Sequence, residues 1–365
     1  MTVPFVDLYR QYLSIKDEVD AAMRSVIEES AFIRSRFVTE FEREFAVAVG
    51  VDRCVSCANG TDALYVAMKA LGLRPGDEVI TTAHSWISTS ETITQADGHV
   101  VFVDTDATTF TIDPARIEEK ITDRTVGIIP VHLYGQPADM DPILRVARAH
   151  GLWVIEDCAQ AHMAEYKGRK VGTMGQMATF SFYPGKNLGA MGDAGCLVTN
   201  DETLADWCEL YARHGGKGEH VMEGINSRMD GLQAAILSVK LPRLDAWTAA
   251  RRQVAAAYDT ALAGIEWLAT PRIAEQRTHV YHLYVIRTRY RDALREHLTR
   301  AGIGTMLNYP RALPFYPAYA RLGHRPADFP NAYAAQGEIL SLPIFPEMSA
   351  SDTELVCSSI RGFRP

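Results

Sequence analysis

The stretch "DPILRVARAHGLWVIEDCAQ", residues 141–160, decides the fold class that we expect for this chain. Its first part predicts a helix, and the apolar run "LWVI" then predicts a strand that ends on two acids. A strand that is almost wholly apolar is typical of a parallel sheet covered by helices on both sides. The stretch therefore indicates an α/β protein with carboxylates at the end of one central strand.

The same alternation of helix and strand continues on both sides of this stretch. Before it, residues 14–29 and 38–49 have the spacing of amphipathic helices. The runs that predict strands are "CVSCA", "RPGDEVITTA", "HVVFVDTD", "TVGIIPVHLYG", "MATFSFYP" and "AGCLVTND". Helical segments are predicted for "NGTDALYVAMKALGL" and "PARIEEKI". This alternation predicts a mostly parallel sheet with helices on both faces.

The character of the sequence changes after about residue 230. A long helical stretch is interrupted near Pro242, and a strand "HVYHLYVIRT", a helix "RDALREHLTRAG" and a proline-rich region from 309 to 346 follow. A chain of 365 residues also suits about two domains. We expect a large domain over 1–240, with a helical N-terminal segment, and a smaller α/β domain over 241–365.

Composition narrows the possible partners and the compartment. A net charge of −8 leaves no basic surplus for a nucleic-acid backbone. No run approaches 18 apolar residues and the N-terminus lacks the pattern of a signal peptide, so we expect no membrane span and a cytoplasmic protein. The six cysteines form no disulfide framework, and "CVSC" at 54–57 has neither a second such pair nor paired histidines. We therefore predict ordinary buried thiols and no metal site.

Ligand sites in open parallel sheets lie beyond the carboxyl ends of the strands, so the residues that follow each strand carry the chemistry. "NGTDAL" after the first strand can bind an anion at a helix N-terminus, although on its own it is better explained as a plain helix cap at Thr61 or Asp62. Glu156 and Asp157 end a buried strand and need partners. A cationic ring nitrogen and an arginine or helix N-terminus are equally good candidates for that partner.

The stretch "FSFYPGKNLGAMGDAG", residues 180–195, places Lys186 among glycines after a strand. A phosphate loop would need a glycine at 180 and a serine or threonine at 187, where this chain has Phe180 and Asn187. A lysine in such a turn can instead lose solvent and act as an amine nucleophile, or it can be a surface lysine. Trp86, after another strand, can stack on a ring or pack in the core.

Taken together, these features match the requirements of pyridoxal 5'-phosphate. That cofactor needs a phosphate cradle, a carboxylate for its ring nitrogen, an aromatic plate and a lysine for the Schiff base.

The chain resembles the DegT/DnrJ/EryC1/StrS family of sugar aminotransferases, which are fold type I pyridoxal-phosphate-dependent transferases. The resemblance covers nearly the whole chain in order. It is carried by "VPFVDL", "ANGTDAL", "RPGDEVITTAHSWI", "TIDPARIE", "IIPVHLYGQPADMDPI", "HGLWVIEDCAQAH", "TFSFYPGKNLGAMGDAGCLVTND", "INSRMDGLQAAIL", "VYHLYVIR" and "LSLPIFPEMS".

The resemblance implies a role for individual residues. Lys186 would be the Schiff-base lysine and proton shuttle, and Asp157 would pair with the ring nitrogen. The remaining cofactor residues would be Gly60, Thr61 and Ser181 at the phosphate, Trp86 and Ala159 on the two ring faces, Gln160 at the phenolic oxygen, and Asn226 reaching the phosphate from the partner subunit of a homodimer. The residues implied near the substrate are His162, Tyr183, Asn308 and Tyr309.

The resemblance also implies a reaction in two halves. An amino acid, typically glutamate, would convert the cofactor to pyridoxamine phosphate, and a nucleotide-linked keto sugar would then accept the amine. Asn308 stands where many relatives have histidine, and "RHGGKGEHVMEG" (213–224) is shortened relative to theirs, so the cofactor residues match better than the substrate residues. We expect a 3-keto sugar. A 4-keto sugar, a free cyclitol or aminoglycoside ketone, and a non-catalytic regulator are the alternatives.

Overall fold

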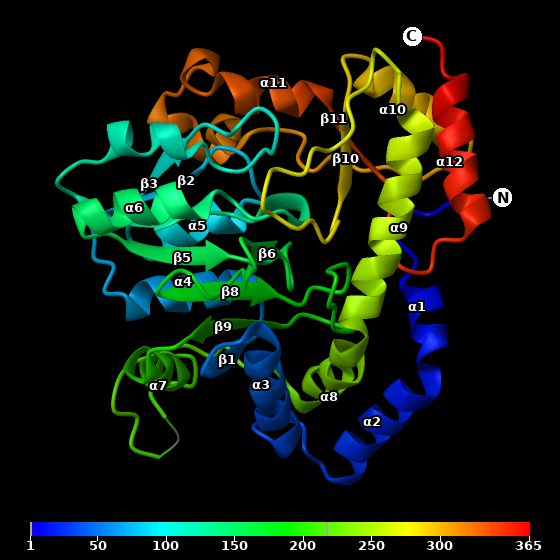
Figure 1. The fold of residues 1–365 in the computed structure, drawn as a ribbon. Coiled ribbons are helices and arrows are strands. Elements are labelled where there is room, and N and C mark those ends of the chain that lie inside the picture. Colours follow the sequence, from blue (N-terminus) through cyan, green and yellow to red (C-terminus); the bar gives the residue numbers. More distant parts are fainter. Residues whose placement is uncertain (1, 217) are drawn as a thin grey trace.

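A seven-stranded sheet forms the centre of the computed structural model, which describes residues 2–216 and 218–365 (Figure 1). The strands lie in the order β1-β9-β8-β5-β4-β2-β3. Their bounds are β1 Arg53–Cys57, β2 Glu78–Thr82, β3 His99–Val103, β4 Thr125–Ile129, β5 Trp153–Asp157, β8 Met177–Ser181 and β9 Gly195–Thr199. Six of these strands run in one direction and β9 runs opposite to them, so the predicted mostly parallel sheet is confirmed.

Helices cover both faces of this sheet, as predicted. On one face lie α4 Gly60–Ala70, α5 Ser88–Gln95 and α7 Glu202–Tyr211, and on the other lie α3 Arg36–Val49, α6 Met140–His150 and α8 Gly231–Lys240. Successive strand residues point to opposite faces, which is why Val154 and Ile155 of β5 belong to different core clusters. The segment "PARIEEKI" forms two short 3₁₀ turns, Pro114–Arg116 and Glu118–Lys120.

Four phenylalanines join α3 to the sheet. Phe45 of α3 meets Phe180 of β8 edge to face, with 5.0 Å between ring centroids, and meets Phe182 in the same way at 5.1 Å. Phe41 packs against Phe182 at 5.3 Å. Because Phe180 and Phe182 lead directly into the loop that carries Lys186, this cluster fixes the start of that loop.

The C-terminal part of the chain builds a second core beside the sheet. It contains α9 Leu244–Leu262, β10 Tyr284–Arg287, α10 Arg291–Arg300, β11 Ile339–Leu342 and α12 Ala350–Gly362. The N-terminal α1 Leu8–Ser14 and α2 Lys16–Glu28 lead away from this part along the side of the molecule, so both chain ends lie near α12 (Figure 1).

The boundary between the two cores does not follow the chain exactly at one residue. Val3 packs in the C-terminal core, whereas Leu313, Tyr319 and Phe329, which precede α11 Pro330–Glu338, pack in a core cluster of the large sheet. Tyr319 and Phe329 meet Phe102 of β3 there. The helix interruption expected near Pro242 is present as a 3₁₀ turn, Leu241–Arg243, between α8 and α9. The division into domains at residue 240 stays a prediction.

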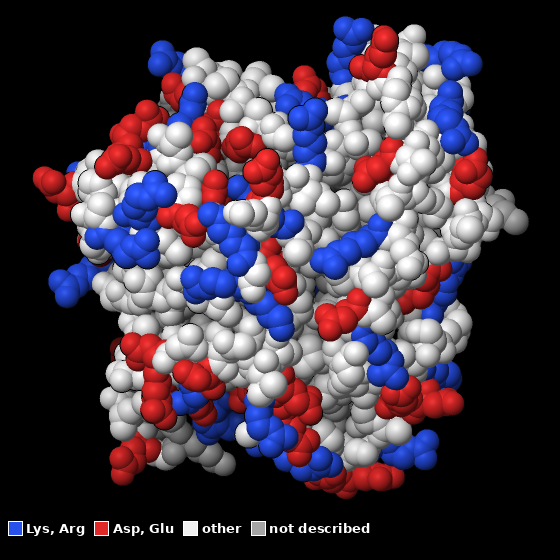
Figure 2. Space-filling model, in the orientation of Figure 1, with Lys and Arg blue, Asp and Glu red and all other residues white. Residues whose placement is uncertain are grey.

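The distribution of charged side chains and the state of the cysteines agree with what the composition predicted. Acidic and basic side chains are interspersed over the face drawn in Figure 2. All six cysteines are described, and each is buried and free, which confirms that the two cysteines of "CVSC" are buried thiols. Within residues 2–216 and 218–365, no helix has both the length and the apolar character needed to cross a bilayer.

The phenylalanine cluster yields a stability prediction. Phe45 is fully buried, so Phe45→Ala should lower the free energy of unfolding by about 3–5 kcal/mol through lost burial and a residual cavity. Val47 lies on the same helix and is 75% exposed, and Val47→Ala should therefore change it by less than about 0.5 kcal/mol. Urea titration followed by circular dichroism measures both, and equal losses would show that the cluster does not bear on stability.

Candidate active site

The predicted site segments meet at the carboxyl edge of the sheet. Because β1, β2, β5 and β8 are parallel, the residues that follow them, and the first residue of the antiparallel β9, reach the same edge. The turns after β1 and β8 and the start of β9 are in close contact there. A Cβ on Gly60 would lie 2.7 Å from Cβ of Ser181, and a Cβ on Gly195 would lie 2.3 Å from the carbonyl carbon of Asn59. Glycine is therefore required where these two turns touch.

The N-terminus of α4 is open toward this edge. Asn59 is its N-cap, since its side-chain oxygen accepts the N–H of Asp62 at 2.8 Å, so the cap expected at Thr61 or Asp62 was wrong. The Thr61 hydroxyl lies 2.7 Å from that of Ser88. Within the described chain, the N–H groups of Gly60 and Thr61 have no backbone or side-chain acceptor. Two free donors at the positive end of a helix, beside Ser181, can hold an anion.

Glu156 faces away from this edge and is fully satisfied. It accepts hydrogen bonds from His132 Nε2 at 3.0 Å and from the N–H groups of Gly172, Met174 and Gly175 at 2.7–3.0 Å. Burial alone would raise its pKa, but these donors together hold the pKa below the usual value.

The neighbouring His132, Glu156 and Cys158 are close enough to resemble a metal site. Both ring nitrogens of His132 are already engaged, because Nδ1 accepts the N–H of Ala138 at 3.0 Å and Nε2 donates to Glu156. The imidazole has no lone pair left for a metal, so the group is a buried hydrogen-bond network.

Asp157 ends the same strand on the opposite side and is less well compensated. Its oxygens accept the Thr89 hydroxyl at 2.8 Å and the N–H of Ala159 at 3.1 Å, both from neutral donors. Burial raises its pKa, and those hydrogen bonds and the nearby Lys186 only partly oppose the rise. A buried carboxylate with so little compensation would be stabilised by a cation that binds beside it.

Lys186 supplies the amine at this edge. It is half-buried, and burial lowers its pKa to about 8, although the charge of Asp157 opposes that effect. Its side chain donates no hydrogen bond to any described residue, and its backbone N–H donates to the Tyr183 carbonyl at 2.8 Å. An amine with a pKa of about 8 is neutral for a substantial fraction of the time near pH 7.5, which covalent and proton-transfer chemistry require.

An aromatic wall closes one side of the site. Trp86 is 56% exposed, and its ring centroid lies 5.6 Å from that of Tyr309. Gln160 accepts the N–H of Tyr134 at 2.7 Å and donates to the Tyr309 hydroxyl at 2.7 Å, so one of its two amide hydrogens remains available. A flat ligand can therefore lie against an exposed indole with a polar group beside it.

The residues predicted near the substrate are scattered. Tyr183 is 59% exposed beside Lys186. His162 is fully buried, packs against Phe180 and Phe182 with centroids 5.4 and 5.7 Å away, and neither ring nitrogen has a partner among the described residues. Asn308 accepts the Ser341 hydroxyl at 2.9 Å through its side-chain oxygen. Their roles toward substrate stay predictions.

Asn226 lies beside the first turn of α4 and is exposed. The adjacent Ser227 holds it there, because its hydroxyl donates to Asp62 at 2.7 Å and accepts the N–H of Ala58 at 3.0 Å. Residue 217 of the shortened segment 213–224 lies outside the described residues.

Several residues of the site were not anticipated. Thr89 binds Asp157, Ser88 binds Thr61, and His84 Nε2 lies 2.7 Å from the Tyr134 hydroxyl, which donates to the Asn308 carbonyl. "HSWISTSE" holds three of them, and its clustered hydroxyls after a strand were the available signal. The sequence around Tyr134 gave no such signal, since the residues that Tyr134 contacts belong to distant segments.

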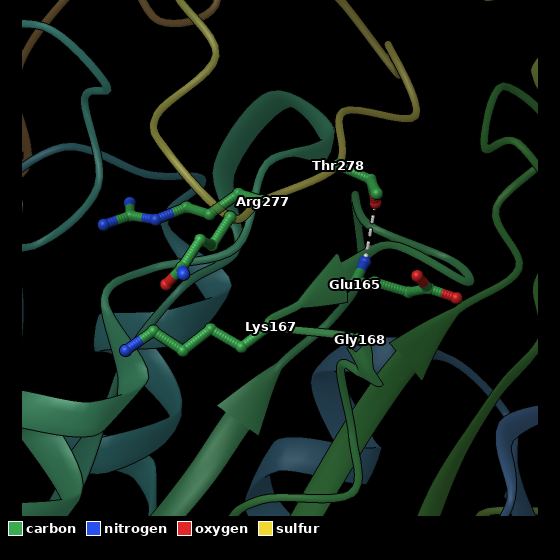
Figure 3. A pocket seen from close by; sticks show the side chains of 6 residues that line it. Glu165, Lys167, Gly168, Arg277 and Thr278 are labelled. Carbon is green, nitrogen blue, oxygen red and sulfur yellow. Dashed lines mark hydrogen bonds between the residues drawn. The ribbon is translucent and has the colours of Figure 1, made fainter.

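A separate open pocket of about 500 Å³ lies at the hairpin formed by β6 Glu165–Tyr166 and β7 Arg169–Lys170 (Figure 3). The Glu165 N–H donates to Thr278 across it at 2.7 Å. Its cations are already paired, Lys167 with Asp141 and Arg277 with Asp139. None of the predicted site residues lines this pocket.

Comparison with known proteins gives the class first: the fold, with an amine and a buried carboxylate at one sheet edge, is that of aminotransferases. The chain belongs to the DegT/DnrJ/EryC1/StrS aminotransferase family, whose model matches residues 13–361.

Two relatives align along nearly the whole chain. It is 45% identical to the "pleiotropic regulatory protein" of Geobacillus stearothermophilus, covering 100% of this chain and 99% of that protein. It is 40% identical to dTDP-3-amino-3,4,6-trideoxy-alpha-D-glucose transaminase of Streptomyces venezuelae, covering 98% and 95%.

Two solved structures superpose closely. DesV of S. venezuelae in complex with a ketimine intermediate matches with a TM-score of 0.96 and 39% identity, over 99% of this chain and 98% of that one. NtdA of Bacillus subtilis with bound cofactor PMP matches with a TM-score of 0.91 and 30% identity, over 99% of this chain and 84% of that one.

The lowered pKa of Lys186 can be tested by competitive labelling with acetic anhydride, since only the neutral amine reacts. In protein freed of bound carbonyl compounds, labelling of Lys186 should rise with a midpoint near pH 8. Lys16, whose pKa Asp20 raises above the usual value, should be labelled only at higher pH and is the internal control. Asp157→Asn removes a charge that raises the pKa of Lys186, so the midpoint should fall further. Coincident midpoints for Lys186 and Lys16, read by mass spectrometry, would contradict the site.

Proposed function

We propose that this protein is a pyridoxal-phosphate-dependent aminotransferase that transfers an amino group from glutamate to a nucleotide-linked 3-keto sugar. The observation that carries the proposal is the pairing of Lys186, whose pKa is about 8, with the under-compensated Asp157 at one edge of the sheet. A protonated pyridine nitrogen is the counter-charge that Asp157 lacks, and an aldehyde is what a half-buried amine can bind covalently.

The residues at the edge fit this cofactor. The free N–H groups of Gly60 and Thr61, with the Ser181 hydroxyl, would hold its phosphate. Trp86 and Ala159 would enclose the ring, and the remaining amide hydrogen of Gln160 would reach the phenolic oxygen. When bound, the cofactor supplies an electron sink for the amino-acid carbanion.

Lys186 would move the proton in both halves of the reaction. Its burial favours the neutral amine, which can accept a proton from one carbon and return it to another. Asp157 would stay ionised once it faces a cation, because an opposite charge at close range stabilises the carboxylate.

The names of relatives support the acceptor. The S. venezuelae relative is named for a dTDP-3-amino sugar, and a Pseudomonas aeruginosa relative, 40% identical, for a UDP-linked 3-oxo sugar acid. The regulatory name of the Geobacillus relative supports the alternative of a non-catalytic regulator. The presence of Lys186 and its lowered pKa favour the enzyme, since a sensor needs no proton shuttle. The six buried free thiols accord with a cytoplasmic location.

We also propose that the site is completed by a second copy of the chain. Tyr183 and Met191 of the lysine loop are 59% and 40% exposed, and Phe32, Ile33 and Trp86 are 43–56% exposed. Exposed apolar side chains of this size are typical of a protein interface. Asn226, exposed beside α4, would then reach the cofactor phosphate of the partner subunit.

The acceptor can be tested with a panel of 3-keto and 4-keto dTDP- and UDP-sugars and a free cyclitol ketone, each with glutamate and pyridoxal phosphate. The expected product is a 3-amino nucleotide sugar, identified by mass and by nuclear magnetic resonance. Lys186→Ala should abolish turnover and also the borohydride-stabilised link to the cofactor. Turnover of the 4-keto sugars or the cyclitol alone would replace the proposed acceptor, and reductive labelling at another lysine would remove Lys186 from its role.

The shared site can be tested by mixing subunits. Lys186→Ala and Asn226→Ala each impair every site of their own homodimer. A mixed dimer contains one site with both residues intact only if Asn226 acts across the interface, so co-refolding should restore activity above that of either parent. Activity no higher than the average of the parents would place Asn226 in its own subunit or show that the chain acts alone.

A further inference from the structure

Asn187 follows the predicted Schiff-base lysine and is buried, with only 2% of its surface exposed. Its side-chain nitrogen donates to the Val280 carbonyl at 2.9 Å, and its side-chain oxygen lies 3.3 Å from Nδ1 of His282. Both partners belong to the segment 279–282, which precedes β10 and is about ninety residues away in sequence. The carboxamide therefore ties the lysine loop to another part of the fold.

The segment that holds Asn187 is itself held from two sides. The Val280 N–H donates to the Gly135 carbonyl at 2.9 Å, on the loop after β4. From α9, Arg251 donates to the Tyr281 carbonyl at 3.2 Å and Arg252 to the His279 carbonyl at 3.0 Å. The anchor of Asn187 is thus rigid, because its partner segment cannot shift without breaking these bonds.

The polarity of the bond to His282 is also determined. Burial, followed by the positive charges of Lys186 and Arg251, holds the pKa of His282 well below its usual value, so the imidazole is neutral. Since the Asn187 nitrogen already donates to Val280, its oxygen is the acceptor, and His282 carries its proton on Nδ1. The Asn187 nitrogen then has an acceptor and its oxygen has a donor.

Lys186 has one backbone restraint inside its own loop, the bond from its N–H to the Tyr183 carbonyl at 2.8 Å, so its link to the rest of the fold depends on this anchor. Its side chain donates to no described residue. The far end of the loop is held by Lys240, whose Nζ donates to the Gly189 carbonyl at 2.7 Å. Between the two ends, Asn187 is the side chain adjacent to the lysine, and a shift of its backbone moves the ε-amine directly.

We propose that Asn187 is a positioning residue for Lys186: by locking the lysine loop onto Val280 and His282, it returns the ε-amine to one place and keeps it shielded from water. The inference rests on the proposed aminotransferase function. Loss of these hydrogen bonds would still allow Lys186 to bind the cofactor aldehyde covalently, since that reaction does not need the amine in one fixed position. It would impair proton transfer, which needs the amine within a narrow range of positions.

The test uses Asn187→Ala in the full-length protein, with two readouts. A loosened loop admits water, so the acetylation midpoint of Lys186 should rise from about 8 toward 10.5. With glutamate and the accepted keto sugar, kcat should fall by roughly 10²-fold, the loss typical of about 1 Å of misplacement, with a much smaller change in KM. Borohydride labelling of Lys186 by pyridoxal phosphate should persist.

Gln136→Ala is the matched control. Gln136 is also 2% exposed, and its carboxamide likewise joins two distant backbone positions, Arg272 and Ala274. Its loss should lower stability by a similar amount and leave the Lys186 midpoint unchanged. A shift of equal size in both variants would mean that general loosening, and not Asn187, controls the lysine.

A second pair of variants tests the same lock from outside the loop, should Asn187→Ala not fold. His282→Asn keeps a donor near Nδ1 and should retain the wild-type midpoint, whereas His282→Leu removes the donor and should raise it. An unchanged midpoint and kcat in Asn187→Ala, or equal behaviour of the two His282 variants, would overturn the inference. If borohydride reduction did not link pyridoxal phosphate to Lys186 in the wild-type protein, that result would instead overturn the proposed function.

Discussion

The burial of two adjacent carboxylates at the end of β5 is the constraint on which the site depends. Strand geometry sends Glu156 and Asp157 to opposite faces, so they cannot share partners. Glu156 obtains four donors from His132 and the backbone at 172–175. Asp157 obtains two neutral donors, and its pKa is raised. The same strand end therefore provides one structural carboxylate and one that can accept a cationic ligand.

Close contact between turns follows from the parallel sheet. Since the turns after β1 and β8 and the start of β9 reach one edge, Gly60, Ser181 and Gly195 touch, and side chains at the glycines would collide. This contact brings the open N-terminus of α4 next to the strand that leads to Lys186. The aromatic cluster of Phe45, Phe180 and Phe182 holds that strand from the other face, so the anion site and the amine are placed by the same packing.

Regular patterns made most of the fold predictable. Apolar runs such as "LWVI" identified the strands, and their both-sided burial predicted the helical layers. The helix α5, "STSETITQ", was missed because threonine and serine have weak helix propensity, and it forms through packing against β2 and β3. Thr61 was a reasonable cap by residue type, but Asn59 takes that place because α4 begins at Gly60, two residues earlier than a cap at Thr61 would allow.

By itself, the sequence determined the fold class, the family, and the residue types of the site, because periodicity and motif spacing are local properties. Only the tertiary structure decided the protonation behaviour and the hydrogen-bond partners of those residues. The pKa values of Lys186 and Asp157 depend on burial, and the links of Gln160 to Tyr309 and of Asn187 to Val280 join residues 93 to 149 positions apart. Such contacts have no local signal, since they exist only when the two cores pack together.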